Sequence, residues 1–187
     1  MKILWFDCET SGLNEVKNDI ITMAFIAEIH GKVQGELSLT CKPFSFDNVS
    51  PKALEINGIS MEELETYPSP QEAFKKMLRF FDGYINKFDK GDKFYLAGYN
   101  TGFDQKFLKE FFKKNDHKYM FSYMSPKIFD VMQIALYMDL FLHFDFNDHK
   151  LGTVCEQLGI ELDAHDAMND IRATRELVQG FHGRWSV

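Results

Sequence analysis

The alternation of apolar and polar positions predicts several strands near the start of the chain. Residues 2–10 are an apolar run that ends in an acidic pair, and residues 19–30 and 33–42 have the composition and alternation of strands. The reversal between the last two is only a few residues long, so these strands are expected to be antiparallel. Two further strands are expected over residues 93–100 and 127–130.

Helical signals dominate the remainder of the sequence. A short helix is expected over 51–56, and a longer one over 70–88 begins with the capping pattern Ser69-Pro70-Gln71-Glu72. Further helices are expected from Phe103, after Asp130, and over 151–158 and 167–181; residues 139–149 fit either a loop or a broken helix. Strands that alternate with helices predict an α/β fold, with a mixed sheet of an antiparallel meander plus parallel strands flanked by helices.

Length and composition are those of one globular unit. The 187 residues carry no internal repeat and no linker, so residues 1–187 are expected to form a single domain. No apolar run is long enough for a signal peptide or a membrane span. The three cysteines are scattered and odd in number, which is typical of reduced thiols. We therefore expect a cytoplasmic protein with no membrane contact.

The net charge of −7 excludes a broadly basic surface, but the charge is unevenly distributed. Residues 71–127 carry 12 basic and 7 acidic side chains, which makes this third of the chain the place to hold a polyanion. Lys106, Lys109 and Lys113 share one face of the helix expected from Phe103. These lysines either steer a phosphate backbone or form an ordinary solvated helix face.

Acidic side chains stand at three places where strands end or helices begin. Asp7 and Glu9 end the first strand and share one of its faces, whereas Cys8 points to the other face and is interpreted as packing. Asp104 follows the strand over 93–100, and Asp170 lies at the start of the last helix. In open α/β sheets, ligands gather at the carboxyl ends of strands.

Four carboxylates that meet at one point repel one another unless cations lie between them. The expected cofactor is therefore about two divalent ions, and ligation by oxygen alone favours Mg²⁺ or Mn²⁺ over zinc. If Asp166 caps the last helix, His165 and Asp170 occupy the two positions whose side chains meet across a helix start. Both side chains can then face the same point.

Three segments contain these acidic residues, namely Phe6-Asp7-Cys8-Glu9-Thr10-Ser11-Gly12-Leu13, Tyr99-Asn100-Thr101-Gly102-Phe103-Asp104 and His165-Asp166-Ala167-Met168-Asn169-Asp170. Together they resemble the motifs of the DEDDh group of DnaQ-like 3′→5′ exonucleases, a family with the ribonuclease H-like fold. The segment Ala53-Leu54-Glu55-Ile56-Asn57-Gly58-Ile59 is similar to the stretch that lies beside the 3′-terminal nucleotide in that family. The resemblance covers roughly residues 3–178 and leaves a short C-terminal tail.

The resemblance implies a role for each of these residues. Asp7, Glu9, Asp104 and Asp170 would be the metal ligands, with Asp7 shared between two ions, and His165 would be the general base. Residues that would contact substrate are Thr10, Leu13, Asn57, Asn100 and Phe103. Phe103 fits a core position equally well, and for Asn100 closing the turn is the favoured interpretation.

The implied activity is removal of nucleoside 5′-monophosphates from the 3′ end of a nucleic acid, with single-stranded DNA as the leading substrate. Alternatives are an exoribonuclease of the same group, a non-catalytic nucleic-acid-binding module and a hydrolase of small nucleotides. No recruitment motif identifies a polymerase or another replication partner.

Overall fold

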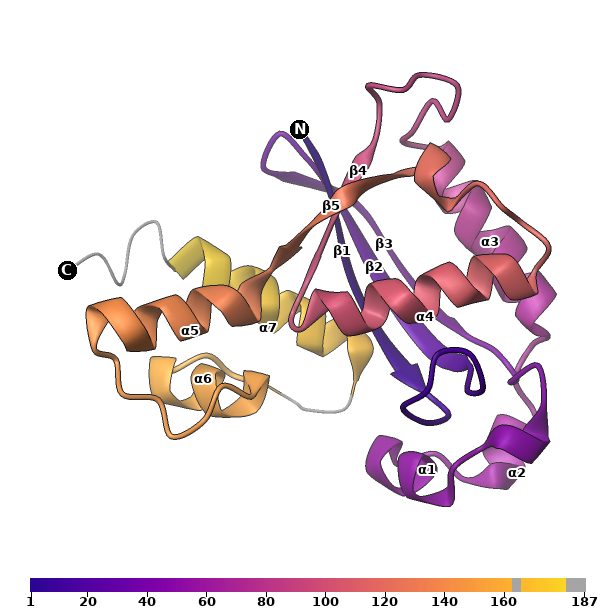
Figure 1. Cartoon of the computed structure of the whole chain (residues 1–187), viewed down its shortest axis with the longest axis horizontal. Coiled ribbons are helices and arrows are strands. Elements are labelled where there is room, and N and C mark those ends of the chain that lie inside the picture. Colours follow the sequence, from indigo (N-terminus) through magenta and orange to yellow (C-terminus); the bar gives the residue numbers. More distant parts are fainter. Residues whose placement is uncertain (163–165, 181–187) are drawn as a thin grey trace.

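A five-stranded mixed sheet forms the centre of the protein in the computed structural model, which describes residues 1–162 and 166–180 (Figure 1). The strands are β1 (Lys2–Thr10), β2 (Ile20–Ile29), β3 (Lys32–Thr40), β4 (Phe94–Gly98) and β5 (Met124–Asp130). Their spatial order is β3-β2-β1-β4-β5. The strands β1, β2 and β3 form an antiparallel meander, and β1, β4 and β5 are parallel. The predicted mixed sheet is confirmed.

Helices cover both faces of this sheet (Figure 1). They are α1 (Pro51–Asn57), α2 (Met61–Leu64), α3 (Pro70–Asp82), α4 (Thr101–Lys114), α5 (Val131–Leu142), α6 (Leu151–Leu158) and α7 (Ala167–Gly180). Helices α3 and α4 pack on one face, and α5, α6 and α7 on the other, whereas α1 and α2 lie near the carboxyl end of β1. Within the described residues, no helix has both the length and the apolar character needed to cross a membrane.

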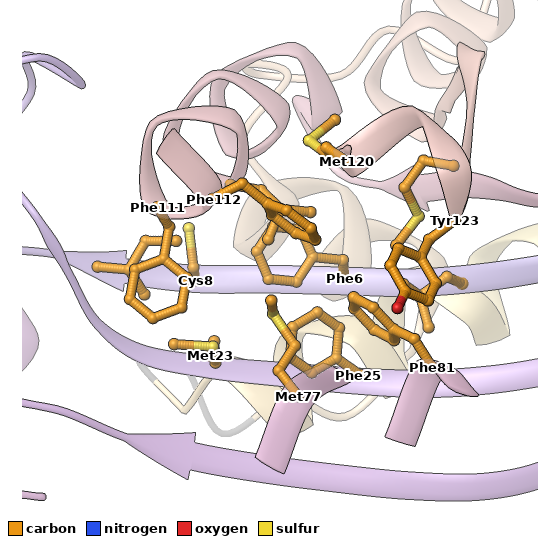
Figure 2. Close-up of a cluster of buried hydrophobic side chains, with 14 of the residues drawn as sticks. Phe6, Cys8, Met23, Phe25, Met77, Phe81, Phe111, Phe112, Met120 and Tyr123 are labelled. Carbon is orange, nitrogen blue, oxygen red and sulfur yellow. The ribbon is translucent and has the colours of Figure 1, made fainter. Parts of the chain in front are cut away.

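The side-chain alternation of β1 divides the core into two clusters. Leu4, Phe6 and Cys8 pack toward α3 and α4, while Trp5 packs toward α5 and α7. The first cluster is rich in aromatic rings (Figure 2), among which Phe6 stacks on Phe25 at a centroid distance of 4.8 Å. Because β1 is covered on both faces, the charged residues at its carboxyl end emerge directly from a dry core.

Helix α3 is shorter than the sequence predicts. Its start has the expected capping box, in which Ser69 and Glu72 hydrogen-bond each other's backbone. The predicted end at residue 88 is wrong, because Gly83 caps the helix through its N–H and the chain then turns into a loop. In that loop the side chain of Asp92 accepts a hydrogen bond from the backbone N–H of Asn86 at 2.9 Å, which holds the chain away from helical geometry.

Other boundaries differ by smaller amounts. Helix α4 begins at Thr101 rather than Phe103, and β5 begins at Met124 rather than residue 127. Part of the stretch left open over 139–149 continues α5 as far as Leu142. The sequence did not predict α2 or the two 3-10 turns η1 (Phe46–Asn48) and η2 (Met120–Ser122). The predicted helix over 151–158 is confirmed, and residue 181 of the last predicted helix lies outside the described residues.

Close packing of β4 on β1 makes a stability prediction at Gly98. A methyl group on this residue would lie 2.6 Å from the backbone oxygen of Phe6, and neither strand can move away without disturbing the sheet. Gly98→Ala should therefore lower the free energy of unfolding by about 1–3 kcal/mol in urea titrations. The matched control is Gly102→Ala, since nothing lies within 4 Å of a methyl group there in α4. Equal stability of the two variants would contradict this account of the packing.

Candidate metal centre

Three carboxylates meet at the carboxyl end of β1. Asp7 and Glu9 project from the face of the strand opposite Cys8, and Asp170 approaches them from the first turn of α7. One carboxylate oxygen from each lies within 4.8 Å of the others. This spacing is short enough for all three to bind one cation, and the sequence prediction that these residues converge is borne out by the geometry.

Helix α7 is fixed across the sheet by a part-buried ion pair. The Nε of Arg175 lies 2.6 Å from Oε2 of Glu28 on β2, and the indole Nε1 of Trp5 donates to the same oxygen at 3.1 Å. Arg175 is little more than one turn beyond Asp170 in the same helix. The pair joins α7 to β2 and adds to the apolar packing of Ile171 and Leu177 that holds this helix on the sheet.

The start of α7 is capped as predicted. Oδ1 of Asp166 accepts a hydrogen bond from the backbone N–H of Asn169 at 2.9 Å, which makes Asp166 the N-cap and places Asp170 in the first turn. His165, which is predicted to face the same point, lies outside the described residues.

Asp104 stands beside this trio and has a different environment. It lies in the first turn of α4, its side chain is 3% exposed, and its Oδ1 accepts a hydrogen bond from Sγ of Cys8 at 3.2 Å. It contributes no oxygen to the tight group formed by the other three carboxylates. The predicted fourfold cluster is thus observed as three close carboxylates and a neighbouring buried one, whose charge still acts on Asp7.

Burial and mutual repulsion disfavour negative charge at this site. Burial, then the carboxylates of Asp104, Asp170 and Glu9, hold the pKa of Asp7 well above its ordinary value. Burial likewise raises the pKa of Asp104 to about 7, although the thiol of Cys8 and nearby backbone N–H groups favour the ionised form. A divalent cation would offset this repulsion, and a donor set made of carboxylate oxygens fits a hard cation.

The turn between β4 and α4 is held by Asp130. Oδ1 of Asp130 accepts from the backbone N–H of Asn100 at 2.9 Å and from that of Met132 at 3.1 Å, so that one carboxylate joins this turn to the start of α5. Asn100 has a φ of 59°, a left-handed conformation that asparagine tolerates better than most residues. The geometry agrees with the interpretation of Asn100 as the residue that closes the turn.

Predicted substrate contacts lie around the same end of the sheet. The hydroxyl of Thr10 donates to the backbone oxygen of Gly12 at 2.7 Å, and the side-chain amide of Asn57 donates to the backbone oxygen of Thr10 at 3.1 Å. Leu13, in the loop that follows, is 85% exposed. Thr10 and Asn57 are therefore joined directly, and an apolar side chain projects into solvent beside them.

Phe103 combines features of both interpretations given for it. Its ring packs 4.8 Å from that of Phe107 against the core, yet the residue remains half-buried at the start of α4. It directly precedes Asp104 in the first turn of α4.

Sequence reasoning missed two contacts that shape the site. Alternation correctly placed Cys8 on the opposite face from Asp7, but nothing in the pattern signals that its thiol would meet Asp104. Asp130 was recognised only as a helix start, and its second partner, the backbone of Asn100, comes from a different loop. Both contacts depend on how α4 is seated on the sheet.

Comparison with known proteins gives the family. The sequence profile of the exonuclease family (RNase_T) matches residues 4–178. The PolC-type DNA polymerase III of Bacillus cereus is 27% identical over 174 residues, which are 92% of this chain and 11% of that polymerase.

Two solved structures share the fold. Exonuclease I of E. coli in complex with a dT13 oligonucleotide superposes with a TM-score of 0.80 at 22% identity, covering 98% of this chain and 41% of that chain. The zinc-bound form of the complex between E. coli exonuclease I and single-stranded DNA gives 0.79 at 23% identity, with 98% and 41% coverage. The chain thus spans about a tenth of the polymerase and two fifths of exonuclease I.

The predicted fold and family are therefore both confirmed. The superpositions show that this chain shares the fold of exonuclease I, and the profile match over residues 4–178 shows that it belongs to the exonuclease family.

Proposed function

We propose that this chain is a divalent-metal-dependent hydrolase that removes nucleoside 5′-monophosphates from the 3′ end of single-stranded DNA. The observation that carries the proposal is the convergence of Asp7, Glu9 and Asp170 within 4.8 Å, with buried Asp104 beside them. A structural role alone would not favour four carboxylates where burial and repulsion already raise the pKa of Asp7 and Asp104.

The ligand assignment follows from these positions. Asp7, Glu9 and Asp170 would hold one Mg²⁺ or Mn²⁺ ion, and Asp7 with Asp104 would hold a second. When bound, the ions supply positive charge that stabilises both the attacking and the leaving oxygen at phosphorus. Asp7 would be the ligand shared by both ions, because it belongs to the close trio and also interacts electrostatically with Asp104.

The general base in this proposal is His165. A water oxygen would form a bond to the terminal phosphorus while His165 accepts a proton of that water. The bond from phosphorus to the 3′ oxygen of the preceding nucleotide breaks, and this oxygen keeps the bonding electrons and takes a proton from solvent to become the new 3′-hydroxyl. An imidazole suits this step because it changes protonation state near neutral pH. The position of His165, directly before the capping residue Asp166, supports the assignment.

The terminal nucleotide would lie against the loop after β1. Leu13 offers an exposed apolar surface, Thr10 and Asn57 form a joined polar edge beside it, and Phe103 offers part of an aromatic ring for stacking. Asn100 would act on substrate only through the turn that it closes.

The proteins to which this chain is similar favour DNA over RNA as the substrate. The solved exonuclease I complex contains a dT13 oligonucleotide, and the sequence relative is a DNA polymerase. No described contact in this chain identifies a group that would read a 2′-hydroxyl, so the preference rests on these likenesses.

Cleavage of end-labelled oligonucleotides tests the proposal directly. DNA and RNA strands labelled at the 5′ end should be incubated with the protein and Mg²⁺ or Mn²⁺. We expect a descending ladder on DNA that a chelator abolishes, because the reaction needs the cations. A ladder on RNA alone would reassign the substrate, and an intact strand in both reactions would refute the enzymatic proposal.

Substitution of the base gives a second test. His165→Ala should lower the cleavage rate by about 10²–10⁴-fold, because the water loses its proton acceptor, and should leave Mn²⁺ binding unchanged. His30→Asn is a suitable control, since His30 is exposed in the β2–β3 turn and has a φ of 52° that asparagine tolerates. Near-normal turnover by the His165 variant would show that another group is the base.

The raised pKa of Asp104 predicts how stability depends on pH in the absence of metal. The ordinary value is 3.8 and the folded value is about 7, so the folded state binds the proton more tightly than the unfolded state. The associated stability is fully present below about pH 4 and is lost as the pH rises through about 7. Because asparagine cannot ionise, metal-free Asp104→Asn should be more stable than the wild type at about pH 8, with the difference shrinking toward pH 4.

Thermal unfolding in chelator measures this difference. Adding Mg²⁺ at about pH 8 should raise the Tm of the wild type more than that of Asp104→Asn, since only the wild type has a charged carboxylate at position 104 to bind the ion. A metal-free variant that is less stable than the wild type at about pH 8 would mean that ionised Asp104 stabilises the fold instead.

A further inference from the structure

The thiol of Cys8 makes a specific contact inside the aromatic core. Its Sγ lies 3.2 Å from Oδ1 of Asp104, and the two side chains are 7% and 3% exposed. The Cys8 side chain is surrounded by the apolar cluster that includes Met23 and Phe111 (Figure 2). A hydrogen bond between two buried groups is stronger than the same bond at the surface.

Orientation is the property that such a contact controls. A carboxylate at the start of a helix can rotate about two side-chain bonds, and in Asp104 the thiol of Cys8 acts together with nearby backbone N–H groups to hold it. The Cys8 thiol contacts Oδ1 directly, so it bears on how the carboxylate is turned toward a cation. Residues that hydrogen-bond a metal ligand commonly set the orientation of that ligand.

We infer that Cys8 is a positioning residue that orients Asp104 for the second cation, an inference that rests on the function proposed above. The strand segment from Asp7 to Glu9 then serves three carboxylates. Its outer two residues are proposed ligands on one face of the strand, and its central residue, on the opposite face of the strand, contacts the proposed ligand Asp104.

The same core contains a matched thiol with a different partner. Cys41 belongs to the same apolar cluster, is fully buried, and donates from Sγ to the backbone oxygen of Ile20, also at 3.2 Å. That oxygen is already fixed by its strand and needs no further orientation. Loss of the Cys41 thiol therefore measures how much packing and one sulfur hydrogen bond contribute to stability when no metal ligand is involved.

Substitutions at these two cysteines separate positioning from packing. Cys8→Val keeps an apolar side chain of similar size but removes the donor, and Cys8→Ser keeps a donor. Cys41→Val is the control, and Cys8→Ala adds a smaller side chain if valine disturbs folding.

Binding of Mn²⁺ to the substrate-free protein, followed by electron paramagnetic resonance, is the primary measurement. For Cys8→Val we expect the weaker of two Mn²⁺ affinities to fall by about 10–100-fold, with Cys8→Ser close to the wild type and Cys41→Val unchanged. In cleavage assays, kcat of Cys8→Val should fall in parallel while KM for the oligonucleotide stays the same.

Two outcomes have distinct meanings. If Cys8→Val and Cys8→Ala bind Mn²⁺ as the wild type does and lose only as much stability as Cys41→Val, Cys8 is a packing residue and the inference is overturned. If the wild type binds two Mn²⁺ ions but cleaves no nucleic acid, the proposed function fails. The positioning role is still supported in that case if the weaker Mn²⁺ affinity is lost in Cys8→Val and kept in Cys8→Ser.

Discussion

Repulsion among the carboxylates at the end of β1 is the constraint on which the rest of the structure depends. Burial raises the pKa of both Asp7 and Asp104, and each neighbouring carboxylate adds to the effect on Asp7. A fold that holds such a group together has to supply the free energy from elsewhere. Here it comes from a strand covered on both faces, with aromatic rings on one side and three helices on the other.

The site is assembled from separate elements, each fixed by its own contact. The pair formed by Arg175 and Glu28 joins β2 to helix α7, which carries Asp170, and Asp130 joins the turn before α4 to the start of α5. Both contacts join segments far apart in the sequence. The carboxylates are consequently held by the tertiary structure, so they keep their positions while they repel one another.

Sequence patterns predicted the parts of the site that depend on local structure. Alternation along β1 placed Asp7 and Glu9 together, and capping chemistry at Asp166 placed Asp170 in the first turn of α7. Features that depend on packing could not be predicted in this way. The contact between Cys8 and Asp104 follows from how α4 packs on the sheet, which no period in the sequence encodes.

The central claim is that these carboxylates hold two cations at the scissile phosphate, with Asp7 in contact with both. The most direct test is a crystal structure with Mn²⁺ and a nucleoside 5′-monophosphate, with data collected at the manganese absorption edge. The account predicts two anomalous peaks, one contacted by Asp7, Glu9 and Asp170 and the other by Asp7 and Asp104. A single peak, or none at the end of β1, would contradict it.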